Sequence, residues 1–172
     1  HLQELEKIGR QLAEEEPARV VEALSRFLSG MVAFHEARHV SDNRAGVPIS
    51  QCVIDRTYLR SDDEPFLRGV DHELRAALTS VIEVPAAART TVLDLLAHYY
   101  VRRGTVYFYA ARILLNALAY PPDEPRARGG DHFADVAVRL AGVDPQTLRD
   151  RALALYGECF GGYVPLRPVE CP

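Results

Sequence analysis

Two histidines four residues apart, with a glutamate directly after the first, form the most chemically informative pattern in the sequence. His35 and His39 stand in the stretch HEARH, and Glu36 follows the first of them. On a helix, side chains four residues apart lie on one face, so both imidazoles can bind the same metal ion. Glu36 is rotated by about 100° from His35, where it can accept a proton from an activated water. The pattern therefore indicates metal-assisted hydrolysis.

The segment that carries this pattern is expected to be a long helix. Apolar residues recur at spacings of three and four over residues 17–43, and Gly46 and Pro48 are expected to end the helix. One face combines apolar and ionisable residues: Leu24, Leu28, Met31, His35, His39 and Asp42. Unpaired buried polar groups cost about 1–3 kcal/mol each, so an inward-facing histidine pair needs a partner such as a metal ion. Without a metal, the two would be hydrogen-bonded histidines near a helix end.

The remaining sequence predicts a single, mainly α domain over residues 1–172, with five to seven helices around the HExxH helix. Stretch 47–69 is the least helical, and it allows at most a short strand or hairpin at 47–60. We expect the tail, residues 157–172, to be irregular. Other helices are expected over 2–12, 70–84, 86–120 with a break at Gly104, 131–142 capped by Asp131, and 144–158 capped by Asp144.

The stretch HEARHVSD resembles the active-site helices of zinc metallopeptidases, whose signature is HExxH. In the gluzincin group of these enzymes, a glutamate on a later helix completes the metal site and is often followed by small residues. DHELRAA offers Glu73, followed by Ala76 and Ala77. The resemblance implies a Zn²⁺ cofactor and a peptide or protein substrate. The implied zinc ligands are His35, His39 and Glu73.

The resemblance also implies roles for residues around these ligands. Glu36 would be the general base, and Asp42 would orient a ligand histidine or bind the metal itself. Asp71 and His72 are immediate neighbours of Glu73 and are alternative third ligands. Glu36 would otherwise be a solvated carboxylate on the helix surface.

Cleavage of an amide bond also needs a donor for the oxyanion that forms on the carbonyl. His132, in the stretch RGGDH, is the histidine candidate. His98 lies in an apolar segment and is expected to be a hydrogen-bonded core residue. The stretch HYYVRRGTVYFY adds four tyrosine candidates: Tyr99, Tyr100, Tyr107 and Tyr109.

The short segment before the metal helix leaves other functions open. Zinc peptidases of this type usually place a β-sheet there, but only 34 residues precede His35 and they are expected to be helical. The substrate strand would come from 47–69, the domain would be a reduced relative, or it would be a non-catalytic helical interaction domain. EARH is also half of a di-iron motif, whose second Glu-x-x-His the chain lacks.

Composition excludes several classes of protein. The net charge of −4 over 172 residues gives no electrostatic basis for nucleic-acid binding. No apolar run is long enough to cross a membrane. The first residue is His1, so we expect a processed form or an excised domain, and localisation stays open. The cysteines form no CxxC pair; Cys159 and Cys171 either form a disulfide or stay free thiols.

Overall fold

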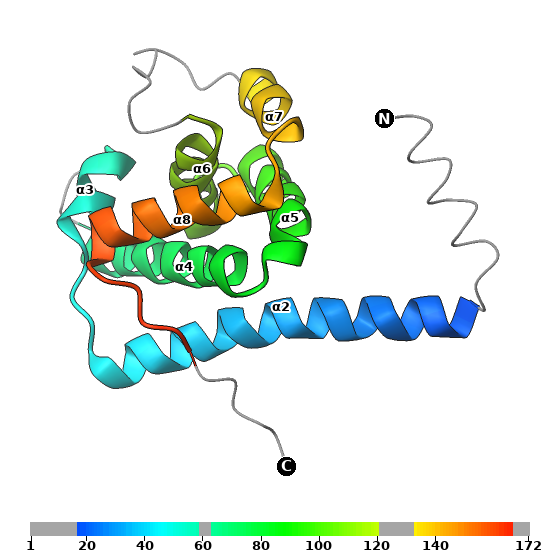
Figure 1. The fold of residues 1–172 in the computed structure, drawn as a ribbon. Coiled ribbons are helices and arrows are strands. Elements are labelled where there is room, and N and C mark those ends of the chain that lie inside the picture. The colour runs from blue at the N-terminus through cyan, green and yellow to red at the C-terminus, as the bar shows by residue number, and fades with distance from the viewer. Residues whose placement is uncertain (1–16, 59–62, 121–132, 167–172) are drawn as a thin grey trace.

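The computed structural model describes residues 17–58, 63–120 and 133–166, and its regular elements in these ranges are all helices (Figure 1). The expected mainly α class is therefore confirmed. The elements are α2 (Pro17–Ala45), α3 (Gln51–Thr57), α4 (Glu64–Glu83), the 3-10 turn η1 (Pro85–Ala87), α5 (Ala88–Val101), α6 (Val106–Ala119), α7 (Phe133–Ala141) and α8 (Pro145–Phe160). The helix expected at 2–12 lies outside the described residues. No described helix is long and apolar enough to cross a membrane.

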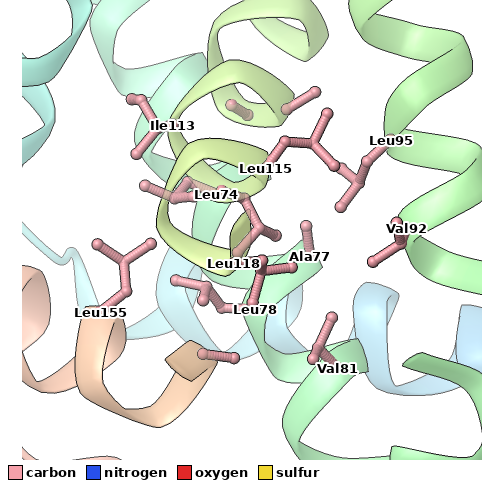
Figure 2. Packing of buried hydrophobic residues seen from close by; sticks show 14 of the residues in the cluster. Leu74, Ala77, Leu78, Val81, Val92, Leu95, Ile113, Leu115, Leu118 and Leu155 are labelled. Atoms are coloured by element: carbon pink, nitrogen blue, oxygen red, sulfur yellow. The ribbon is translucent and has the colours of Figure 1, made fainter. Parts of the chain in front are cut away.

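α4 is the central helix of the domain. It packs against α2, α3, α5, α6 and α8, and every residue from Leu74 to Ile82 is buried. Figure 2 shows α4 side chains packed among those of α5, α6 and α8. Full burial of a leucine or valine side chain contributes about 1.5–3 kcal/mol, so this cluster fixes how the surrounding helices are placed.

α4 begins at Glu64, earlier than the start expected near residue 70. Asp63 caps it by accepting a hydrogen bond from the Phe66 N–H at 3.2 Å, and a proline follows in the first turn. Within this helix, a Cβ on Gly69 would lie 2.8 Å from Val106 Cγ1. The missing side chain therefore lets α4 and α6 approach closely, one turn before Glu73.

Two of the predicted helix boundaries are confirmed. Gly104 adopts a positive φ of 79° between α5 and α6, a backbone conformation that glycine adopts without strain. Asp144 caps α8 by accepting a hydrogen bond from the Thr147 N–H at 2.9 Å. Hydrogen bonds from the Thr147 hydroxyl and N–H lower the pKa of Asp144 below its ordinary value. Asp131, the predicted cap of α7, lies outside the described residues.

Residues 51–57 form a helix, in the stretch where the sequence allowed at most a short strand or hairpin. Val53 is fully buried in the core. The Ser50 N–H donates to Asp71 Oδ1 at 2.9 Å, and the Ser50 hydroxyl donates to the carbonyl of Cys159 at 2.6 Å. These contacts with α4 and α8 outweigh the β preference of Val53 and its neighbour Ile54.

A disulfide joins Cys52 of α3 to Cys159 of α8, with the two Cα atoms 5.0 Å apart. Neither alternative expected for Cys159 was right, since it is neither free nor paired with Cys171, which lies outside the described residues. α8 continues to Phe160, into the part expected to be irregular tail. The helical conformation places Cys159 against α3, and this contact could not be inferred from the spacing of the cysteines.

The apolar stripe of α2 is buried only in part. Leu28 exposes 40% of its surface, whereas Asp42 exposes 4%. Figure 1 shows the N-terminal part of α2 extending past the other described helices. The expectation of one continuous inward face was therefore wrong at Leu28, because that part of α2 lies away from the central helix.

Candidate metal centre

Three side chains from α2 and α4 meet in one cluster. The Nε2 atoms of His35 and His39 lie 3.1 Å apart. Glu73 Oε2 lies 3.4 Å from Nε2 of His35, and Glu73 Oε1 lies 3.6 Å from Nε2 of His39. Among the described residues, these three form the group of potential metal ligands whose donor atoms all lie within 4.8 Å of one another. The structure thus brings together the three residues predicted as ligands.

The separations in the cluster fit donors around a single ion. In a tetrahedral zinc site with bonds of about 2.0–2.1 Å, neighbouring donor atoms are roughly 3.3 Å apart. The observed separations of 3.1, 3.4 and 3.6 Å lie close to that value. A set of two histidines and one glutamate is typical of catalytic zinc sites, in which a fourth position takes water or substrate.

The environment of His39 favours its neutral imidazole, the form that binds metals. Burial lowers the pKa of His39 below its ordinary value, and the nearby His35 acts in the same direction. The carboxylate of Glu73 acts in the opposite direction but does not cancel the effect of burial. Deprotonation of a ligand histidine is a requirement for metal binding, so partial burial assists the site.

Neither neighbour of Glu73 takes its place in the cluster. Asp71 is buried, accepts a hydrogen bond from Arg75 Nε at 2.7 Å and accepts another from the Ser50 N–H. The ring centre of His72 lies 6.4 Å from that of His39. Asp71 therefore holds α3 and α4 together, and Glu73 is the residue that faces both histidines.

Asp42 is buried, but it lies against Arg38 rather than a ligand histidine. Asp42 Oδ1 lies 3.6 Å from Arg38 Nη1, and its Oδ2 has no hydrogen-bond partner among the described residues. Arg38 donates to Thr79 Oγ1 and to the carbonyl of Val164, both at 3.0 Å. The Arg38–Asp42 pair thus connects α2 to α4 and to the segment after α8.

A hollow of about 200 Å³ lies beside the cluster, between α2, α4, α5 and α6. His35, Glu36 and Glu73 line it together. Glu36 is exposed, so its carboxylate is accessible to water. The predicted base and two of the predicted ligands therefore face one space that a small molecule can enter.

The wall of the hollow formed by α5 and α6 contains Asp94 and His98, which the sequence analysis did not assign to the site, beside the predicted donor Tyr107. His98 Nε2 lies 3.2 Å from Asp94 Oδ2, and the His98 ring stacks on Tyr107 with centres 5.3 Å apart. All three residues line the hollow. The prediction of a core histidine was therefore wrong for His98. The spacing of four residues in DLLAH was the available signal for the Asp94–His98 pair.

The predicted oxyanion donors are distributed unevenly around the hollow. Tyr107 lines it, whereas Tyr99 stacks on Phe108 and Tyr109 packs edge-on against the same ring. His132 lies outside the described residues. Tyr100 is exposed and does not line the hollow, so Tyr107 supplies a phenol there and His98 supplies an imidazole outside the three-residue cluster.

No protein-family model matches the chain, and comparisons with curated proteins and with solved structures give no match either. The inferred function therefore depends on the geometry and chemistry of the side chains alone.

Proposed function

We propose that the chain is a zinc-dependent hydrolase of the metallopeptidase class. The observation that carries this proposal is the convergence of His35, His39 and Glu73 on one point, beside a hollow that also contains Glu36. The ligand set matches catalytic zinc sites, and the hollow gives a substrate access to it.

Zinc held by these residues would supply Lewis acidity, which lowers the pKa of a water to about 7 and polarises a carbonyl group. Glu36 adjoins His35 in sequence and faces the hollow. Its carboxylate accepts the proton of the attacking water and passes it to the leaving amine. The carboxylate of Asp94 lies against His98, and that of Glu73 lies against the two histidines, which leaves Glu36 in the position of the base.

The opposite wall supplies a partner for the negative charge that develops on the carbonyl oxygen. His98 is held by Asp94 and by stacking on Tyr107, so its ring has a defined orientation. An imidazole or phenol that donates a hydrogen bond to this oxygen stabilises the transition state more than the substrate. His98 and Tyr107 are the residues proposed for that role.

The central experiment separates metal binding from hydrolysis. The protein, loaded with zinc, is assayed for bound metal by mass spectrometry and for cleavage of a mixed peptide pool. We expect one zinc per chain, and we expect Glu36→Gln to keep that zinc while losing about 10²–10⁴-fold in activity. Glu22→Gln, on the same helix and paired with Arg26, is the matched control and should retain both.

Two results would contradict the proposal. A chain that binds no zinc at micromolar concentration is not a zinc enzyme, whatever its fold. A chain that binds zinc but cleaves nothing, with or without Glu36, is the non-catalytic interaction domain considered from the sequence. A di-iron enzyme needs two Glu-x-x-His motifs around its metal site. The described residues contain a single group of potential metal ligands, and this disfavours a di-iron enzyme.

A further inference from the structure

The hollow beside the metal cluster has a buried floor and an exposed rim. Buried lining residues, all small or apolar apart from two hydroxyls, are Ala77, Ser80, Thr91, Leu95 and Ala110. Exposed lining residues, which mark the opening, are Val32, Glu36, Asp94 and Tyr107. The charged groups thus lie at the opening or beside the cluster, and the floor carries no charge.

The two hydroxyls of the floor are directed to neighbours within the protein. Ser80 donates to the carbonyl of Ala76 at 3.2 Å, and Thr91 Oγ1 lies 4.0 Å from Met31 Sδ. Ala77 and Ala110, on facing helices, leave the space open because their side chains are small. A group that enters the floor therefore meets mainly apolar surface, which favours an apolar group over a polar one.

The metal cluster lies at one end of this space. Gly69 of α4 contacts Val106 of α6, and Tyr107 follows Val106 and stacks on His98. His98 and Glu73 both line the hollow. Met31, which contacts Thr91, stands one helical turn before His35 on α2. A substrate whose carbonyl lies between Glu36 and His98 can thus extend a side chain toward Ala77 and Leu95.

The size of the hollow limits what it holds. A cavity of about 150 Å³ lined by apolar side chains accepts benzene. At about 200 Å³, the hollow accepts one side chain of leucine or phenylalanine size. It is too small to enclose two residues of a peptide.

The described part of the chain offers no sheet edge to hold an extended peptide. Its regular elements are helices, whose backbone groups are paired internally. Peptidases that add the substrate as a strand gain affinity from main-chain hydrogen bonds along several residues. Here the gain comes instead from the one side chain that fills the hollow.

We propose that the hollow selects short amide substrates in which a leucine- or phenylalanine-sized side chain adjoins the cleaved bond. This inference rests on the proposed hydrolase function, but its binding step is independent of catalysis. Residues beyond the selected one contribute little to recognition.

The binding step is tested on metal-free protein by NMR titration with N-acetyl-L-phenylalaninamide. Chemical-shift changes are expected at Ala77, Leu95 and Ala110, and none with N-acetylglycinamide. Ala77→Leu, which fills the floor, should weaken binding at least tenfold. Ala97→Leu adds the same bulk on the exposed side of α5 and should leave binding unchanged.

A second variant covers the case in which Ala77→Leu fails to fold. Leu95→Ala enlarges the floor and should raise kcat/KM for a tryptophan substrate relative to a leucine substrate by tenfold or more. With zinc-loaded wild-type protein, extending a capped dipeptide amide to eight residues should change kcat/KM by less than threefold.

The outcomes separate this inference from the proposed function. The inference alone is overturned if Glu36-dependent cleavage rises more than tenfold with peptide length. It is also overturned if the cleavage rate does not depend on the side chain next to the cleaved bond. Probe binding that Ala77→Leu abolishes, without any hydrolysis, contradicts the hydrolase function and supports the hollow as an apolar binding site.

Discussion

Arg38 lies between His35 and His39 in the sequence of α2 and also contacts α4, through Thr79. Arg38 is 5% exposed, and its guanidinium carbon lies 5.6 and 5.5 Å from the ring centres of Tyr156 and Tyr163. Burial raises the pKa of both phenols, and the Glu83 carboxylate, which accepts a hydrogen bond from Tyr163, raises that of Tyr163 further. Both phenols therefore stay neutral beside Arg38. The carboxylate that lies beside the buried Arg38 is that of Asp42.

Replacement of Asp42 by asparagine tests which role this residue has. The change leaves Arg38 buried without its carboxylate, so we expect a loss of about 3 kcal/mol in the free energy of unfolding. Loss of a residue that orients a ligand histidine would instead weaken zinc binding by roughly 10–100-fold. Urea unfolding of the metal-free protein and a zinc competition titration measure the two effects.

We expect the zinc affinity of Asp42→Asn to change by less than about threefold, because no described hydrogen bond joins Asp42 to His35 or His39. Asp55→Asn is the control, since Asp55 is exposed and bonded to Gln51. A stable variant with weak zinc binding would show that Asp42 acts on the metal site.

At this scale the sequence predicted the cluster of His35, His39 and Glu73, whereas it did not predict the partners of the residues around it. His35 and His39 share a helix, so their spacing alone fixes their relative position. The resemblance to zinc peptidases predicted Glu73 as the third member. Asp42 and His98 have partners that depend on how other helices are rotated and placed. The sequence does not encode those rotations in any local pattern.

Among the elements, the contact between α4 and α6 depends on Gly69. Replacing glycine by alanine inside a helix normally stabilises it by about 1 kcal/mol. Here the added Cβ would lie 2.8 Å from Val106 Cγ1, and overpacking of this kind costs about 1–3 kcal/mol. We therefore expect Gly69→Ala to lower the free energy of unfolding by about 1 kcal/mol.

The double variant shows whether the contact is the cause. In a Val106→Ala background the clash is absent, and Gly69→Ala should then raise the free energy of unfolding by about 0.5–1 kcal/mol. A four-variant denaturation cycle provides the measurement. Equal effects in both backgrounds would mean that the two helices are not in close contact at this point.

The disulfide links α3 to α8 across 107 residues of sequence. For a loop of that length, the chain-entropy model predicts a stabilisation of about 4–5 kcal/mol. We expect the Cys52→Ala/Cys159→Ala variant to lose stability on that order in urea unfolding, and the wild type to lose as much under reducing conditions. Cys171→Ser should have no such effect, and an equal loss from it would contradict the Cys52–Cys159 pairing.

The elements differed in how far local sequence determined them. The break at Gly104 and the cap at Asp144 have local causes, a permissive backbone and a side-chain hydrogen bond, and both were predicted. α3 was not predicted, because Val53 and Ile54 favour strands in isolation. Its helical form depends on contacts with α4 and α8, which are distant in sequence.

In the molecule as a whole, the metal cluster joins the peripheral helix α2 to the central helix α4. His35 and His39 come from α2, and Glu73 comes from α4. The same two helices are also joined by the bond from Arg38 to Thr79. A metal bound by all three ligands would therefore stabilise the packing of α2 on the rest of the described domain.

Zinc should consequently raise the stability of the whole chain by mass action. At a free zinc concentration 100 times Kd, binding to the native state alone contributes about 2.7 kcal/mol to the free energy of unfolding. We expect this increase in urea unfolding of the wild type and its reversal by a chelator. Glu36→Gln should show the same increase, because Glu36 is not one of the three clustered ligands. Glu73→Ala should show little or none, since it removes the only ligand contributed by α4. An equal zinc effect in Glu73→Ala would mean that the metal binds elsewhere, and the assignment of the cluster would then be wrong.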